Sequence, residues 1–217
     1  KFNAINGKMM FIQGSPILKK HGQIKTGRLS GIVANHVPFF LQPNRLPSFK
    51  TNSIEDWDKK LEGIINETID CDLRLIGGIP PWVIMYFQRI LKKTHKENAN
   101  IVFPNLSLYV HGGVNFKPYK NTLKSIMPNA DFLELYPASE GFFAYQDSQE
   151  DRGMLLLLNS GVFYEFIKAD EFFDENPKRL TLKDVELGID YAMVITTNAG
   201  LWAYNLGDTV RFVSKNP

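Results

Sequence analysis

The sequence has a single cysteine, Cys71, and its charges nearly cancel, with 25 Lys and Arg against 23 Asp and Glu in 217 residues. One cysteine cannot form an internal disulfide or a cysteine-rich metal site, which is typical of a protein from a reducing compartment. A formal net charge of +2 gives no bulk attraction to nucleic acid or to an anionic membrane. We therefore expect a cytoplasmic protein whose partners are selected by a local site.

Long apolar runs and the common phosphate-binding motifs are also missing from the sequence. No run approaches the roughly 20 apolar residues that a membrane-spanning helix needs, so no membrane partner is expected. Neither G-x-x-x-x-G-K-[ST] nor G-x-G-x-x-G occurs, so any phosphate would be bound by other means. The four histidines lack the H-x-x-x-H spacing of a zinc site.

The apolar residues, 44% of the chain, are enough for a large buried core. Over residues 1–50 they form short stretches broken by Gly and Pro, which indicates strands and loops. Helical spacing then predicts a helix that begins at Ser53, and Pro80-Pro81 can open another. Strands at 73–76, 106–113 and 131–136, separated by helices, predict βαβ units and a partly parallel sheet.

The last third of the chain has a different pattern. Residues 154–170 indicate a hairpin that turns at residues 159–161, and residues 191–212 indicate two or three more strands. The predicted fold is therefore α/β. A mixed, partly parallel sheet with flanking helices would occupy residues 1–150, and an antiparallel β-rich portion would occupy residues 151–217.

The stretch LYPASEGFF places Ser139 and Glu140 together where a short buried strand ends. A serine nucleophile would favour G-x-S-x-G, but Pro137 stands where a glycine is needed. The pair is equally explained by a turn in which Ser139 bonds to backbone amides and Glu140 is solvated. In a third interpretation, Ser139 donates to a phosphate oxygen, Glu140 holds the accompanying Mg²⁺, and Tyr136 offers a stacking face for a base.

Three other segments contain candidates that also have a simple structural explanation. Gly207-Asp208 lies between two strand-like runs and is typical of a hairpin turn, although an aspartate held there could accept two ribose hydroxyls. Gly112-Gly113 after His111 would let the backbone approach a flat ligand, while His111 itself is readily structural. Trp82 either packs in the core or forms a wall of an apolar acyl pocket.

The order and spacing of these segments resemble a known family. HGGVNF, YPASEGFFAYQD and LWAYNLGDTVRF occur in that order, with VPFFLQPNRLPS, EDWDKKL and GIPPW upstream. From about Gly27 to Pro217 this pattern resembles the acyl acid amido synthetases of the auxin-responsive GH3 family, particularly its bacterial branch. That family is a branch of the adenylate-forming superfamily.

The resemblance implies an enzyme that uses ATP and Mg²⁺ to activate a carboxylic acid as an acyl adenylate and transfers the acyl group to an amine such as an amino acid. It implies that Tyr136 lies against the adenine and Ser139 lies near the α-phosphate. Glu140 would bind the Mg²⁺, and Asp208 would bind the ribose hydroxyls.

The resemblance also implies further contacts. Gly112, Gly113 and Val114 would border the base, and Phe142 and Phe143 would line the acyl side.

Some features of the family are missing from this sequence. Its Ser/Thr/Gly-rich phosphate loop does not occur, and Ala203 stands where many relatives have an arginine. The chain opens at Lys1 without an initiator methionine and ends after a strand-like run. We expect residues 1–217 to be the central part of one large adenylation domain, lacking the phosphate loop and the carboxyl-terminal domain, and to be inactive alone. The alternatives are an acyl-CoA ligase, or a nonenzymatic binding module that keeps the fold.

Overall fold

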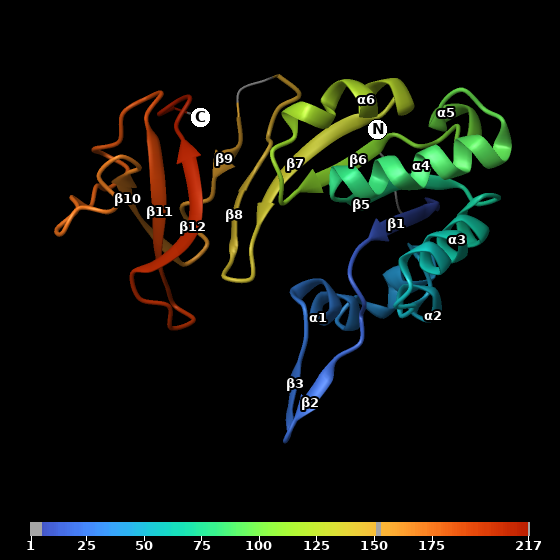
Figure 1. Cartoon of the computed structure of the whole chain (residues 1–217), viewed down its shortest axis with the longest axis horizontal. Coiled ribbons are helices and arrows are strands. Elements are labelled where there is room, and N and C mark those ends of the chain that lie inside the picture. Colours follow the sequence, from blue (N-terminus) through green and yellow to red (C-terminus); the bar gives the residue numbers. More distant parts are fainter. Residues whose placement is uncertain (1–5, 151–152, 217) are drawn as a thin grey trace. The chain divides into compact units, whose positions relative to one another are not determined.

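A parallel sheet organises the first of the two units into which the chain divides, Lys1–Leu135 and Tyr136–Pro217 (Figure 1). The computed structural model describes residues 6–150 and 153–216. In the first unit the strand order is β4-β1-β5-β6-β7, and each neighbouring pair is parallel. The strands are β1 (Lys8–Ile12), β4 (Arg45–Leu46), β5 (Leu73–Gly78), β6 (Leu108–Gly112) and β7 (Asp131–Pro137).

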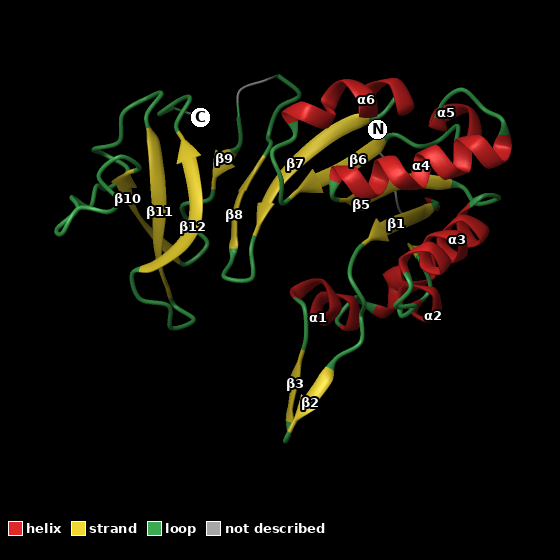
Figure 2. Ribbon diagram, in the orientation of Figure 1, coloured by secondary structure: helices red, strands yellow, loops and turns green. Residues whose placement is uncertain are grey.

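Helices connect these strands, as Figure 2 shows in red. The connections β5-α4-β6 and β6-α6-β7 are the predicted βαβ crossovers, and α4 and α6 contact each other. A small hairpin, β2 (Lys19–His21) with β3 (Ile24–Thr26), precedes the first helix. The helices are α1 (Leu29–Asn35), η2 (Phe39–Asn44), α2 (Phe49–Asn52), α3 (Trp57–Thr68), α4 (Pro80–Thr94), α5 (Ala99–Val102), η3 (Lys117–Tyr119) and α6 (Lys120–Ile126).

The local sequence explains why α4 forms where it does. Its first two residues are Pro80 and Pro81. Backbone N–H groups at these positions have no acceptor within the helix, so the N–H that proline lacks is not missed. The helix ends at His95, whose φ of 54° is left-handed, and its last turn carries basic residues that suit the negative end of the dipole. Its buried face belongs to the core of the first unit, with side chains that include Val83, Tyr86, Phe87 and Ile90. The helix predicted from Pro80-Pro81 is therefore confirmed.

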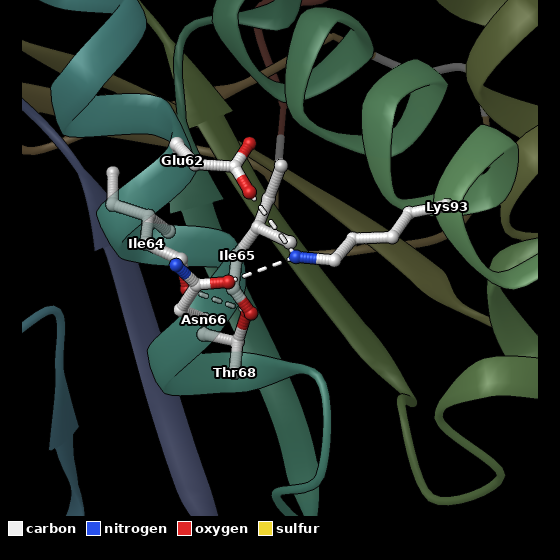
Figure 3. A network of polar contacts seen from close by, with 6 residues as sticks. All are labelled: Glu62, Ile64, Ile65, Asn66, Thr68 and Lys93. Carbon is white, nitrogen blue, oxygen red and sulfur yellow. Dashed lines mark hydrogen bonds and ion pairs between the residues drawn. The ribbon is translucent and has the colours of Figure 1, made fainter.

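Polar contacts tie α4 to α3 (Figure 3). Lys93 Nζ donates to Glu62 Oε1 at 3.1 Å and to Asn66 Oδ1 at 2.8 Å. On the buried side, the hydroxyls of Thr68 and Tyr86 form a hydrogen bond of 2.8 Å, and Thr68 also donates to the carbonyl of Ile64. The two helices are thus joined both at the surface and in the core.

The helix predicted to begin at Ser53 is displaced. The structure has a short helix, α2, that ends at Asn52, and α3 begins only at Trp57. Asp56 is the N-cap of α3, because its carboxylate accepts a hydrogen bond from the backbone N–H of Lys59 at 2.8 Å. Both Ser53 and Asp56 are good capping residues, so their types alone could not decide between them.

The second unit is antiparallel. β8 (Phe142–Tyr145) pairs with β9 (Leu155–Leu156), and a separate sheet has the order β10-β11-β12. Its strands are β10 (Val162–Lys168), β11 (Asp190–Thr197) and β12 (Tyr204–Arg211). The predicted hairpin at 154–170 is wrong, because β9 pairs with β8 and β10 pairs with β11. The core of this unit is aromatic and aliphatic: Phe143, Tyr164, Phe166, Leu180, Val185, Tyr191, Met193 and Ile195.

The predicted fold class is confirmed, since parallel βαβ units are followed by antiparallel strands. The division at residue 150 rested on the change of strand pattern and stays a prediction. Among the residues that the structure describes, no helix combines the length and the apolar character needed to cross a bilayer.

Candidate functional site

Tyr136 and Asp208 meet in the second unit. Tyr136 lies near the end of β7, and Asp208 lies in β12. The Tyr136 hydroxyl donates a hydrogen bond of 2.6 Å to Asp208 Oδ2. The family resemblance assigns both residues to the same nucleotide, and in the structure they are in direct contact.

The position of Asp208 follows from an irregularity in β12. Ala192 pairs with Thr209 and Val194 pairs with Asn205, so residues 206–208 stand opposite the single residue between them. Such a bulge re-aims side chains away from the regular ladder. Gly207 has a φ of +81° and its N–H donates to Asn205 Oδ1 at 3.0 Å. The predicted hairpin turn at Gly207-Asp208 is wrong, because both residues lie inside one strand.

The surroundings of Tyr136 keep its phenol protonated. Its ring packs edge-on against Phe143, with centroids 5.4 Å apart. Partial burial raises the pKa of Tyr136, and the hydrogen bond to Asp208, the charge of Asp208 and the charge of Glu140 raise this pKa further. Tyr136 is therefore a hydrogen-bond donor at neutral pH, and the Glu140 carboxylate is near enough to act on it.

Ser139 and Glu140 form the tip of a tight turn. Ala138 N donates to the Gly141 carbonyl at 2.8 Å, and Gly141 N donates to the Ala138 carbonyl at 3.3 Å. The Ser139 hydroxyl is exposed, and it forms no hydrogen bond with any other residue that the structure describes. The backbone capping considered for Ser139 is therefore not formed among these residues. Both side chains are available to a ligand.

The two phenylalanines after this turn differ. Phe142 is 41% exposed, whereas Phe143 is 0% exposed and belongs to the core of the second unit. Phe142 can therefore contact a ligand, and Phe143 has no surface to offer one as placed. The acyl-side roles assigned to them stay predictions.

The remaining candidates lie in the first unit. Gly112 is the last residue of β6. Gly113 has a φ of +79°, a conformation that residues with a side chain rarely adopt. The space beside Gly113 is open, since no atom lies closer than 3.7 Å to the position of an added Cβ. Val114 is 38% exposed. Trp82, half-buried at the start of α4, packs on Trp57 with centroids 5.0 Å apart. Its packing role is visible, and its contact with an acyl group stays a prediction.

His111 is structural. It is 4% exposed and stacks on Phe116 with centroids 3.8 Å apart. Burial lowers the pKa of His111 to about 4, so the ring is neutral at pH 7. Its Nδ1 has no hydrogen-bond partner among the described residues.

Glu140 is the residue that the family resemblance assigns to Mg²⁺. In residues 6–150 and 153–216, no group of three or more His, Cys, Asp or Glu side chains could hold one. Mg²⁺ is commonly bound by one or two carboxylates together with substrate phosphates and water. The unengaged Glu140 carboxylate, next to the unengaged Ser139 hydroxyl, fits that kind of site.

Sequence reasoning missed the bond between Tyr136 and Asp208 and the bulge that orients Asp208. No local signal links two residues so far apart in the chain. The spacing of Asn205 and Gly207 is a signal for the bulge, since asparagine often bonds to the backbone N–H two residues on.

The last third of the chain matches a known family model. Residues 155–217 match the sequence profile of the GH3 family central domain. A jasmonoyl-L-amino acid synthetase of Nicotiana attenuata is 33% identical over 118 residues, which are 51% of this chain and 20% of that protein.

Solved structures share the fold. The GH3.15 acyl acid amido synthetase superposes with a TM-score of 0.67 at 13% identity, over 97% of this chain and 46% of that one. A 2-hydroxyisobutyryl-CoA ligase superposes with a TM-score of 0.60 at 11% identity, over 95% and 41%. This chain therefore shares its fold with both of these proteins, and it spans less than half the length of each.

Proposed function

We propose that the chain is part of a GH3-family acyl acid amido synthetase, an ATP-dependent ligase that forms an amide bond through an acyl adenylate. The observation that carries the proposal is the contact between Tyr136 and Asp208 in the unit that also holds the unengaged Ser139 and Glu140. The match of residues 155–217 to the GH3 central domain supports the same family. The sequence pattern favours its bacterial branch, and the single cysteine favours the cytoplasm.

The chemistry proceeds in two steps. A carboxylate oxygen of the acid bonds to the α-phosphorus of ATP, while the bond from that phosphorus to the bridging oxygen breaks and pyrophosphate leaves. The amine nitrogen then attacks the acyl carbon, AMP leaves, and the nitrogen loses a proton. The acid is already ionised near pH 7, so the first step needs no general base.

The first step brings two anions together, and the proposed residues reduce that repulsion. Glu140 would hold Mg²⁺, which neutralises phosphate charge when it is bound. The Ser139 hydroxyl would donate to an α-phosphate oxygen. Asp208 would accept from the ribose, and the Tyr136 ring would contact the adenine, so that the α-phosphorus is held in position. Gly112, Gly113 and Val114 would border the base, with Trp82, Phe142 and Phe143 on the acyl side.

A pyrophosphate exchange assay of the full-length protein tests this assignment. We expect Glu140→Ala to abolish exchange between pyrophosphate and ATP, because the change removes the proposed magnesium ligand. The carboxylate forms no hydrogen bond or ion pair with a described residue whose loss could have the same effect. The matched control is Glu175→Ala, which removes an exposed acid of the same unit. Exchange near the wild-type rate in Glu140→Ala would refute the magnesium role.

An acyl-CoA ligase is the second candidate, because one solved relative with this fold is a CoA ligase. Both functions share the adenylation step and differ in the group that accepts the acyl. Mass spectrometry of the products formed from ATP, the acid, mixed amino acids and coenzyme A separates an amide from a thioester. A protein that forms no adenylate with any acid would instead be a nonenzymatic binding module.

A further inference from the structure

A hollow of about 320 Å³ lies in the first unit, beyond the carboxyl ends of β1 and β4. Pro16 follows β1, and Pro47 and Ser48 follow β4. The other walls come from the end of α1, from η2 and from α2, with the residues Ala34, Asn35, Gln42, Arg45, Phe49 and Asn52. Five of these nine residues carry polar side chains, so the hollow is not an apolar gap in the core.

The sheet topology marks the same place. In the sheet order β4-β1-β5, the strand of this sheet that follows β1 in the chain is β4, on one side of β1. The next strand of the sheet, β5, lies on the other side of β1. The carboxyl end of β1 is therefore a point where the strand order reverses. Ligands of open α/β sheets bind in the crevice at such points.

Arg45 brings an unused positive charge to this hollow. Its Nη1 donates to the Ala34 carbonyl at 2.8 Å. Its other N–H groups have no partner, and no carboxylate lies within ion-pair distance of it, among the residues whose positions are described. Partial burial lowers the pKa of Arg45, yet an arginine stays protonated at neutral pH. A partly buried, charged guanidinium usually has an anionic partner, and Arg45 has none among the described residues.

Asn52 adds an unsatisfied polar atom to the same wall. The residue is 2% exposed, and its Oδ1 has no hydrogen-bond partner within the described part of the chain. A buried oxygen of this kind is costly unless a water or a ligand donates to it. Asn52 lines the hollow, so a small movement of its side chain would present this oxygen to a donor group of a ligand there.

A buried cation, Lys60, contacts Asn52. Lys60 is 4% exposed, and its Nζ donates to the carbonyls of Asn52 at 2.8 Å and of Gln13 at 3.0 Å. The charge of Arg28 acts on Lys60, and together with burial it lowers the pKa of Lys60. Neither cation has a carboxylate partner in the described ranges. Lys60 therefore adds a buried positive charge next to Asn52.

One acid, Glu67, contacts this wall, but it forms no ion pair with Arg45 among the described residues. The Glu67 carboxylate accepts hydrogen bonds from Ser48 N at 2.7 Å, and from Ser48 Oγ and Thr51 Oγ1 at 2.5 Å each. These bonds outweigh burial and lower the pKa of Glu67. Glu67 is therefore charged and held by Ser48 and Thr51, and within the described ranges no ion pair joins it to Arg45.

We infer that this hollow binds the oxyanion group of a small molecule, a carboxylate or a phosphate, on the guanidinium of Arg45. The free donors of Arg45 match two oxygens of either group. Asn52 Oδ1 accepts from a hydroxyl that the same ligand carries. This site is built from the first unit alone and does not depend on the proposed adenylation chemistry.

Calorimetric titration of the purified protein tests this inference. The two probes are inorganic phosphate and glycolate, each of which joins an oxyanion to a hydroxyl, in buffers of equal ionic strength made with chloride. We expect saturable binding of at least one probe, and the two arms distinguish a phosphate from a carboxylate. We expect Arg45→Gln to weaken binding at least tenfold, whereas Arg89→Gln, which removes an exposed arginine of α4, changes it less than twofold.

The absence of saturable binding of both probes would overturn the inference, as would equal binding by Arg45→Gln and the wild type. If Arg45→Gln does not fold, the wild-type protein still decides the question. Phenylglyoxal modifies accessible arginines, and peptide mass spectrometry reports each site. The bound probe should slow modification of Arg45 at least threefold and leave Arg89 unchanged. Equal modification of Arg45 with and without both probes would refute the site.

Discussion

The Tyr136 hydroxyl donates a hydrogen bond of 2.6 Å to Asp208 Oδ2 across 72 positions of the sequence. This contact changes the role expected for both residues. Asp208 has one carboxylate oxygen engaged, so its orientation would already be fixed when the proposed ribose binds. Tyr136 acts on Asp208 through its hydroxyl as well as offering its ring.

Removal of the Tyr136 hydroxyl tests this positioning role. Tyr136→Phe keeps the ring and deletes the donor. A hydrogen bond to a charged group contributes about 1.5–3 kcal/mol, and about 1.4 kcal/mol corresponds to a factor of ten in binding. In the full-length protein we expect KM for ATP to rise about tenfold while kcat falls less. Tyr164→Phe is the control, because it removes a phenol that bonds to the Leu157 carbonyl in the same unit. An unchanged KM in Tyr136→Phe would contradict the role.

The bulge at Gly207 gives a second prediction. An added Cβ at Gly207 meets no atom within 4 Å, so Gly207→Ala creates strain only through its φ of +81°. Such a conformation costs an L-residue roughly 1–2 kcal/mol. We expect a loss of stability of that size in chemical denaturation, together with weaker ATP binding because Asp208 is displaced.

Gly188 provides the matched control for this strain. Its φ is +79° and its added Cβ is equally free of contacts, but it lies before β11 and away from the bulge. Gly188→Ala should lose similar stability and keep its affinity for ATP. Equal loss of affinity in both variants would show that stability alone explains the effect.

His111 predicts a pH dependence of stability. Burial lowers its pKa to about 4, below the ordinary value of about 6.5, so the unfolded chain binds the proton more readily. Stability from this group is complete above pH 6.5 and is lost as the pH falls toward 4, with a slope of at most about 1.4 kcal/mol per pH unit. His111→Phe should remove this part of the slope in denaturation curves, whereas His36→Phe, at an exposed position, should keep it. Identical slopes in wild type and His111→Phe would be the contrary result.

How far the sequence could predict this protein depended on the range of the interactions. The helix at Pro80 and the parallel βαβ units are encoded locally, by proline, glycine and apolar spacing, and they were predicted. The pairing of β9 with β8 rather than β10 depends on contacts between distant segments, so a local turn signal at residues 159–161 was misleading. The bulge that contains Asp208 was missed for a similar reason, because Gly-Asp is compatible with a turn and with a bulge.

The candidate site shows the same division. The residue types of Ser139 and Glu140 indicated a polar turn, and the structure adds that neither side chain forms a hydrogen bond or an ion pair with a described residue. The partial burial of Arg45 and the unsatisfied Asn52 could not be predicted, since both depend on how α1, η2 and α2 surround the end of β1.

Ser139 permits a separation of structural and functional effects. Its hydroxyl is exposed and forms no hydrogen bond with a described residue, so Ser139→Ala should change the free energy of unfolding by less than about 0.5 kcal/mol. If the hydroxyl donates to an α-phosphate oxygen in the adenylation step, the same change should lower the pyrophosphate exchange rate by about tenfold or more, since a neutral donor to a charged oxygen contributes about 1.5 kcal/mol or more. Ser160→Ala is the control, because that hydroxyl bonds to the Leu157 carbonyl and lies outside the turn. Full exchange activity in a stable Ser139→Ala protein would remove Ser139 from the reaction and leave the turn with Glu140 alone.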